Sequence, residues 1–207
     1  MTTNLIFSDR RSLCTYFAKT SRDYQDQGTT FLSSSELQKL LDIQINPELC
    51  ASLMHPDRSK PYGRQVIYQD DLLEIMVATW TPKNMCAPHD HGGSWSAIRI
   101  LQGTSKHQLY RITNQTLHCV HTEFCPTSSS IQCTPNQIHA MGDAGIDQTP
   151  LMTIHAYSKS IPYMMVYDIA NNQTIQVHGT CGAWIPEDTS QIVHVFQQSI
   201  PASDLHI

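Results

Sequence analysis

Two histidines stand two residues apart in the segment PHDHGG, residues 88–93. In an extended backbone, alternate side chains point to the same side, so His89 and His91 can converge on one ion while Asp90 points away. The pair alone does not define a metal site, because such spacing also arises by chance in a chain with eleven histidines. A third ligand is needed, and His139 follows a turn-like stretch some fifty residues later. Taken alone, His139 is more typical of a surface histidine or a hydrogen-bonded one than of a ligand.

The elements that must position these residues change in character along the chain. Residues 1–57 are expected to be a helical lead-in, in which Ser33 and Glu36 have the spacing of a capping box before the apolar run 36–45. Pro47 can begin a second short helix over 47–54. From Arg64 onward, short β-branched and aromatic runs alternate with turn residues, which indicates strands. The predicted strands are 64–69, 72–80, 94–102, 106–112, 115–121, 150–157, 163–169, 173–178 and 192–198.

This order of elements predicts a mainly β fold, an antiparallel barrel or sandwich over about residues 60–200 with a small N-terminal helical segment. We expect one domain over residues 1–207, because the chain is short for two and has no repeat or linker.

Composition excludes several classes of function. The 13 Lys and Arg against 18 Asp and Glu give a net charge of -5 without any basic run, which argues against a nucleic-acid or anionic-membrane partner. No apolar stretch is long enough to span a bilayer, and the N-terminus has no secretory pattern, so a cytoplasmic location is expected. Seven cysteines without any CxxC favour free thiols over a disulfide framework or a zinc ribbon.

The spacing of the histidines resembles the two motifs of the cupin barrel. His89 and His91 match the HxH of the first motif, with Gly103 in register and Ser96 at the position of its acidic ligand. Pro135 and His139 match the second motif, although its spacing is one residue short and its glycine is missing. The resemblance implies a cupin-type barrel. Without the carboxylate it implies a metal held by three neutral imidazoles, with positions left for substrate and oxygen.

Nine residues that could bind a metal or a substrate follow one another over about residues 60–170: Tyr62, Arg64, Trp80, His89, His91, His139, Thr153, His155 and Tyr157. In types and order they resemble the matching residues of cysteine dioxygenases, which oxidise L-cysteine to cysteine sulfinate with Fe(II) and O2. The resemblance implies that Fe(II) is the cofactor, that a small thiol and O2 are the only partners of a monomeric enzyme, and that the three histidines are the iron ligands.

The same resemblance implies roles for the remaining residues. Arg64 would hold the substrate carboxylate, as a guanidinium does bidentately, and Tyr62, two residues before it, would also be a substrate-binding residue. Tyr157 would hydrogen-bond the substrate or oxygen, oriented by His155, which Thr153 steadies. Trp80 and Met164 would form apolar pocket walls. On the residues alone, a solvated arginine of an edge strand is the favoured interpretation of Arg64, and ordinary core that of Trp80 and Met164. The face with Thr153, His155 and Tyr157 is equally typical of a strand whose polar side is merely hydrogen-bonded.

Several positions depart from the family. Ser96 stands where mammalian members carry a cysteine cross-linked to the tyrosine, so no thioether is expected. Ser158-Lys159-Ser160 replaces Ser-Pro-Pro, which excludes a cis-proline there. Cys86 has the wrong offset from the histidine pair to be a ligand. The other histidines are predicted to be surface or ordinary sheet residues, with His118 and His121 on opposite strand faces: His55, His107, His118, His121, His178, His194 and His206.

Three alternatives stay open. The same chemistry could act on 3-mercaptopropionate or another small thiol, the protein could be a cupin that binds metal without turnover, or it could be a zinc-dependent cupin isomerase. The missing carboxylate at Ser96 counts against the isomerase.

Overall fold

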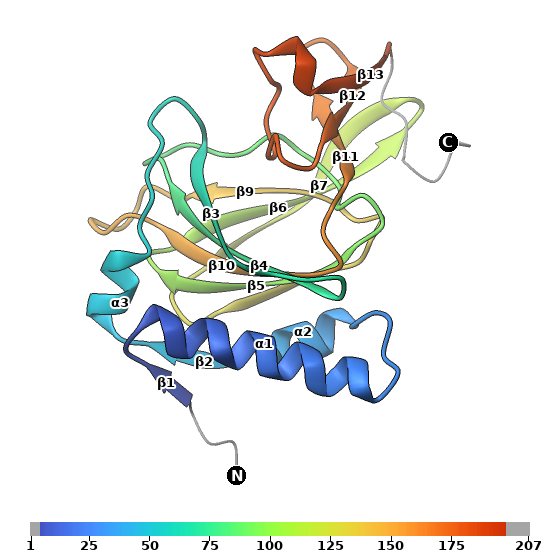
Figure 1. The fold of residues 1–207 in the computed structure, drawn as a ribbon. Coiled ribbons are helices and arrows are strands. Elements are labelled where there is room, and N and C mark those ends of the chain that lie inside the picture. Colours follow the sequence, from blue (N-terminus) through green and yellow to red (C-terminus); the bar gives the residue numbers. More distant parts are fainter. Residues whose placement is uncertain (1–4, 198–207) are drawn as a thin grey trace.

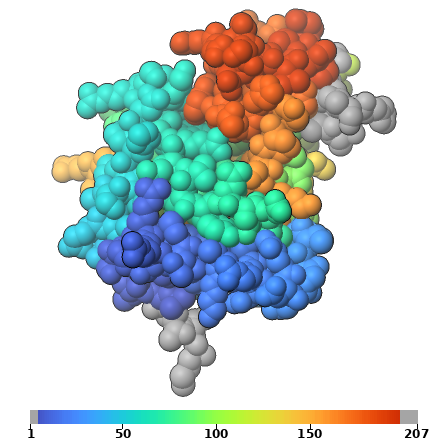
Figure 2. Space-filling view, in the orientation of Figure 1, coloured from blue at the N-terminus to red at the C-terminus, as the bar shows by residue number. Residues whose placement is uncertain are grey.

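The structure, a computed structural model, describes residues 5–197. The α-helices lie in the N-terminal part, together with two short strands, and the remaining strands follow from Tyr62 onward (Figure 1). The helices are α1 (Arg10–Asp26), α2 (Ser34–Leu40) and α3 (Pro47–Ser52), with a short 3-10 helix at Thr189–Gln191. In Figure 2 this helical segment, in blue, forms one end of the visible face, and the C-terminal strands, in orange to red, form the opposite end. Within residues 5–197, no helix is long and apolar enough to cross a membrane.

Each of the three α-helices begins after a polar N-cap residue, whose side chain accepts a hydrogen bond from a backbone N–H of the first turn. In chain order these N-cap residues are Asp9, Ser33 and Asn46. Ser33 and Glu36 form the predicted capping box. The prediction of one helix over 36–45 is wrong at its C-terminal end. Helix α2 ends at Leu40, and β2 (Ile43–Ile45) pairs in parallel with β1 (Leu5–Phe7). Two β-branched isoleucines and a partner strand outweigh the local helical periodicity there.

A five-stranded antiparallel sheet forms the centre of the molecule, in the order β3, β4, β10, β5, β8. One face of β4 and β10, with Ile75, Val77 and Ile154, packs against the leucines of α1 and α2. The opposite face looks into a second core between the sheets. The bounds are β3 Tyr62–Gln69, β4 Leu73–Trp80, β5 Trp95–Gln102, β8 Ser130–Cys133 and β10 Met152–Ser158.

Two three-stranded antiparallel sheets complete the described fold, in the orders β7-β6-β9 and β11-β12-β13. Their bounds are β6 Ser105–Thr113, β7 Thr116–Cys125, β9 Ile138–Asp143, β11 Tyr163–Asp168, β12 Gln173–His178 and β13 Ile192–Phe196. The fold is therefore mainly β and antiparallel with N-terminal helices, as predicted. Every predicted strand is present with its ends within four residues, although residue 198 lies outside the described part. Strands β1, β2, β8 and β9 were not predicted.

Strand β7 contains an irregularity that changes which side chains share a face. Opposite Leu109 lies His121, whereas opposite Tyr110 lies Cys119, so Val120 is an extra residue. Because His118 lies opposite Arg111, His118 and His121 share one face, and the prediction of opposite faces is wrong. A bulge adds one residue to the period-two count, and the sequence gives no sign of it.

Candidate metal centre

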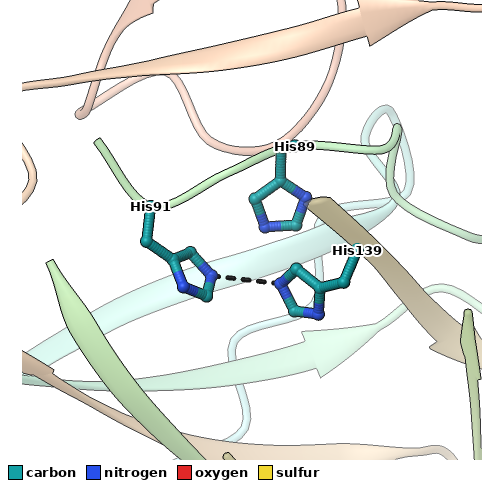
Figure 3. Close-up of side chains that lie close together, drawn as sticks. All are labelled: His89, His91 and His139. Atoms are coloured by element: carbon teal, nitrogen blue, oxygen red, sulfur yellow. Dashed lines mark hydrogen bonds between the residues drawn. The ribbon is translucent and has the colours of Figure 1, made fainter. Parts of the chain in front are cut away.

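Three buried histidines meet between the two sheet layers (Figure 3). His89 and His91 lie in the segment between β4 and β5, and His139 lies in β9. The backbones of His89 and His139 are paired through two hydrogen bonds of 2.9 and 3.0 Å. The Nε2 atoms of His91 and His139 are 3.0 Å apart, and one ring nitrogen from each of the three histidines lies within 4.8 Å of the others. The structure thus brings together the three residues that the sequence singles out.

The segment that carries the pair is held by one unusual backbone position and by a buried carboxylate. Gly92 has a φ of +55°, and a Cβ there would lie 1.8 Å from the carbonyl oxygen of Tyr163, so only glycine fits. Asp90 points away from the histidines, as expected, and accepts hydrogen bonds from the backbone N–H groups of Gly92 and Met165, each 3.0 Å long. Burial raises the pKa of Asp90 to about 6. Through these two hydrogen bonds, Asp90 fixes the segment that carries the histidine pair to β11.

Each histidine uses its other ring nitrogen for a contact inside the protein. Nδ1 of His89 lies 3.0 Å from the carbonyl oxygen of Ala87, and Nδ1 of His91 lies 2.9 Å from Oγ of Ser96. Nδ1 of His139 lies 3.0 Å from Nε2 of His107. These contacts leave the three Nε2 atoms to face one another.

Burial keeps these imidazoles neutral. It lowers the pKa of His89 to about 4 and those of His91 and His139 well below the usual 6.5. Neutral imidazole is the form that coordinates metals, and a set of three suits iron, zinc, copper or nickel. The donor chemistry of the site therefore fits a bound transition metal.

A line of hydrogen bonds runs beside this cluster along the inner face of β10. Nε1 of Trp80 donates to Oγ1 of Thr153 at 2.9 Å, and Oγ1 of Thr153 lies 2.7 Å from Nε2 of His155. Nδ1 of His155 lies 3.1 Å from the hydroxyl of Tyr157. If the threonine donates to His155, the histidine donates to the tyrosine oxygen, and the tyrosine O–H is left to point into the site. The shared face is the one that the period-two pattern predicts.

Ser96 lies directly opposite Tyr157 in the pairing of β5 with β10. Its side chain is fully buried, and its hydroxyl contacts the outer nitrogen of His91. This residue thus contacts a histidine ring where the resemblance would place an acidic ligand. Cys86 is a buried free thiol with Sγ 3.8 Å from Nδ1 of His89, on the outer side of that ring.

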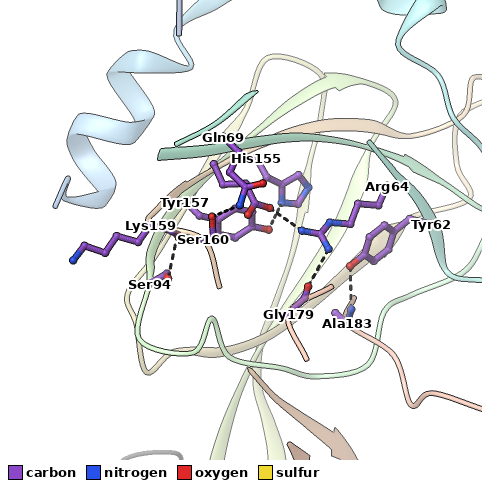
Figure 4. Close-up of polar contacts among 11 residues, drawn as sticks. Tyr62, Arg64, Gln69, Ser94, His155, Tyr157, Lys159, Ser160, Gly179 and Ala183 are labelled. Carbon is purple, nitrogen blue, oxygen red and sulfur yellow. Dashed lines mark hydrogen bonds and ion pairs between the residues drawn. The ribbon is translucent and has the colours of Figure 1, made fainter. Parts of the chain in front are cut away.

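Arg64 reaches the site from β3 but is already paired (Figure 4). Its Nη2 lies 2.7 Å from Oε1 of Glu74, and its Nη1 donates to the carbonyl oxygen of Gly179 at 2.9 Å. Nε of Arg64 is buried and has no hydrogen-bond partner within the described residues. Glu74 was not predicted as a site residue, although an acidic side chain inside the apolar run 72–80 is a visible signal in the sequence.

The predicted wall residues, Trp80 and Met164, line two small cavities beside the histidines. One, of about 30 Å³, is lined by Arg64, Glu74 and Met164, and the other, of about 20 Å³, by Trp80 and His155. Tyr62, Met76, His89, His91 and Tyr157 line both. Each cavity has room for about one or two water molecules. The hydroxyl of Tyr62 accepts a hydrogen bond of 3.0 Å from the backbone N–H of Ala183 (Figure 4).

One of the remaining histidines is not what the sequence predicts. His107 is 2% exposed and contacts both His139 and Glu123, so its assignment as a surface or ordinary sheet residue is wrong. A ring nitrogen of His107 also lies within 4.8 Å of potential metal-ligand atoms of Cys133 and His139. His55, His118, His121 and His194 are exposed and His178 is half-buried, while His206 lies outside the described residues. His107 was missed because its partners lie on neighbouring strands and not nearby in sequence.

No known protein-family profile matches this chain. Among solved structures, it is similar to an uncharacterised conserved protein with a double-stranded β-helix domain from Klebsiella pneumoniae, with a TM-score of 0.47 and 12% identity over 56% of this chain and 87% of that one. A cupin superfamily protein from Desulfitobacterium hafniense gives a TM-score of 0.41 and 13% identity over 53% and 86%. An oxalate oxidase gives 0.43 and 12% over 56% and 60%. Identities at this level leave the activity to be argued from the residues of this chain.

Proposed function

We propose that this protein is a cupin-type, iron(II)-dependent dioxygenase that converts L-cysteine to cysteine sulfinate. The observation that carries the proposal is a set of three buried, neutral histidines without a carboxylate, placed beside the line from Trp80 to Tyr157. In the reaction, both atoms of O2 are added to the thiol sulfur, which is oxidised while the oxygen is reduced. When bound, iron(II) supplies the redox chemistry with O2 that the side chains lack.

The residues of this chain would bind and orient the substrate. His89, His91 and His139 would hold the iron through ring nitrogen atoms that lie within 4.8 Å of one another. When Nδ1 of His155 donates to the Tyr157 oxygen, the hydroxyl of Tyr157 would donate its own hydrogen bond to the substrate or oxygen. Trp80 and Met164 would exclude water from the reacting sulfur.

Arg64 would attract the substrate carboxylate, but only in competition with Glu74. The two side chains form an ion pair of 2.7 Å with the carboxylate nearly buried, so one N–H of Nη2 is used by Glu74 and one of Nη1 by Gly179, while the buried Nε has no partner within the described residues. A substrate of the size of cysteine also needs the lining side chains to move, given cavities of about 30 and 20 Å³. These two features favour a second candidate function, in which the protein binds metal without turnover.

The test is oxidation of thiols by iron-loaded protein. Purified protein reconstituted with Fe(II) without oxygen is mixed with cysteine in air, and oxygen uptake is compared with sulfinate measured by mass spectrometry. We expect one sulfinate for each O2 consumed, and neither iron binding nor product in the His91→Ala variant. Faster turnover of 3-mercaptopropionate would contradict the assignment of cysteine. Iron binding without sulfinate would support the binding-only candidate, and absence of metal binding would contradict both.

A further inference from the structure

Behind His139, a buried histidine and a carboxylate continue a line of contacts to the surface. His107 lies in β6, between β9, which carries His139, and β7, which carries Glu123. Nε2 of His107 is 3.0 Å from Nδ1 of His139, and Nδ1 of His107 is 3.0 Å from Oε1 of Glu123. The His107 side chain is 2% exposed, whereas that of Glu123 is 46% exposed. The line therefore runs from solvent to the centre of the candidate metal site.

The chemistry of the carboxylate fixes the direction of both hydrogen bonds. An ionised carboxylate only accepts, so Nδ1 of His107 carries the ring proton and donates a hydrogen bond to Oε1 of Glu123. In a neutral His107, Nε2 is then the acceptor, and the proton of His139 lies on Nδ1. The lone pair of His139 is left on Nε2, the atom that faces His91. The carbonyl of Ala87 has the same effect on His89, because it too can only accept.

We propose that His107 and Glu123 are positioning residues that hold His139 in the tautomer and ring orientation needed to bind a metal through Nε2. Histidine ligands generally donate their other ring N–H to a protein acceptor, and losing that acceptor commonly weakens metal affinity by about 10- to 100-fold. Here the acceptor is itself a histidine, oriented by a carboxylate on the next strand. The inference rests on the metal-binding part of the proposed function and not on thiol oxidation.

A competing arrangement uses the same atoms differently. His107, Cys133 and His139 are close enough to hold an ion of their own, with Sγ of Cys133 3.8 Å from Nδ1 of His139. In that case Nδ1 of His139 would be a ligand and not a hydrogen-bond donor. The two arrangements differ in the number of ions bound and in the location of the His139 proton.

The first measurement locates the proton in metal-free protein by nitrogen-15 NMR of the histidine rings. We expect the His139 proton on Nδ1 in the wild type and in His107→Gln, whose amide oxygen can still accept. In His107→Phe and Glu123→Ala we expect this preference to be reduced or lost. A wild-type proton on Nε2 of His139 would overturn the proposal. Because no metal is present, this measurement does not depend on the proposed function.

The second measurement is Co(II) and Fe(II) affinity by chelator competition. His107→Phe is expected to bind about 10- to 100-fold more weakly, His107→Gln within about threefold of wild type, and Glu123→Ala between the two. Glu187→Ala, which removes an exposed carboxylate elsewhere, is the matched control and should have no effect. Unchanged affinity in Glu123→Ala and in a folded His107→Phe would overturn the proposal. Two ions per chain, with one lost in Cys133→Ser, would overturn it in favour of the competing arrangement.

Discussion

The metal-free protein is expected to lose stability steeply in mild acid, because it buries neutral histidines. Burial lowers the pKa of His89 to about 4 and that of His155 to about 3, while an unfolded chain has the ordinary value near 6.5. The unfolded state therefore binds protons as the pH falls through 6.5, and the folded state does not until the pH reaches its own lower values. Stability is fully present above 6.5 and falls below it.

The magnitude follows from these values. Between pH 7.5 and 5.0, each of the two histidines lowers the free energy of unfolding by about 2 kcal/mol, or about 4 kcal/mol together. Asp90 acts in the opposite direction, because its pKa is raised to about 6 and the folded state takes up its proton first. That uptake returns about 1 kcal/mol, which leaves a net loss of about 3 kcal/mol. The lowered pKa values of His91 and His139 add to the loss.

The assay is urea unfolding of chelator-treated protein at pH 7.5 and 5.0, with the slope of free energy against urea compared to verify that the same transition is followed. His155→Gln should reduce the difference between the two pH values by about 2 kcal/mol. His194→Gln is the control, because that side chain is exposed on β13 and should not change the difference. Equal free energies of unfolding at the two pH values would refute the reasoning.

Three further predictions follow from single contacts. Glu74→Gln should lower the KM for cysteine by about fivefold, because Arg64 then has a neutral hydrogen-bond partner in place of a charged one, a difference of about 1 kcal/mol. An unchanged KM in oxygen-uptake kinetics would contradict the competition between Glu74 and the substrate. Thr153→Val should cost about 2 to 4 kcal/mol in urea unfolding, because the indole N–H of Trp80 and a histidine nitrogen lose their partner, whereas Thr153→Ser should stay within about 1 kcal/mol of wild type. Gly63→Ala should cost about 3 kcal/mol or more, since its Cβ would lie 1.7 Å from a backbone carbonyl oxygen; a melting temperature equal to that of the wild type would disprove this.

The parts of the site that depend on strand geometry could be predicted from the sequence. His89 and His91, and the series ending at Tyr157, each share a face because alternate residues of an extended chain point the same way. The third histidine, His139, needed the resemblance, since no local pattern links it to the pair. In the structure its strand, β9, pairs directly with the backbone of His89.

The parts that depend on contacts between strands could not be predicted. Glu74 and Arg64 lie on neighbouring strands but not opposite each other, and they meet only because the long arginine side chain reaches along the sheet. His107 meets His139 and Glu123 through the pairing of β6 with its two neighbours. Pairing register is a property of the folded chain, and a bulge such as that at Val120 shifts it without a mark in the sequence.

The backbone pairing of His89 with His139 has a consequence for the order of folding events. These two residues are about fifty positions apart in the chain, so their contact closes a long loop and brings β9 against the segment that follows β4. In an unfolded or partly folded chain, His89 and His91 are close together, but His139 does not yet lie beside them. Tight metal capture during refolding should therefore coincide with this long-range closure, and the rate at which Co(II) colour develops would report the pairing of β9 with the segment that carries His89.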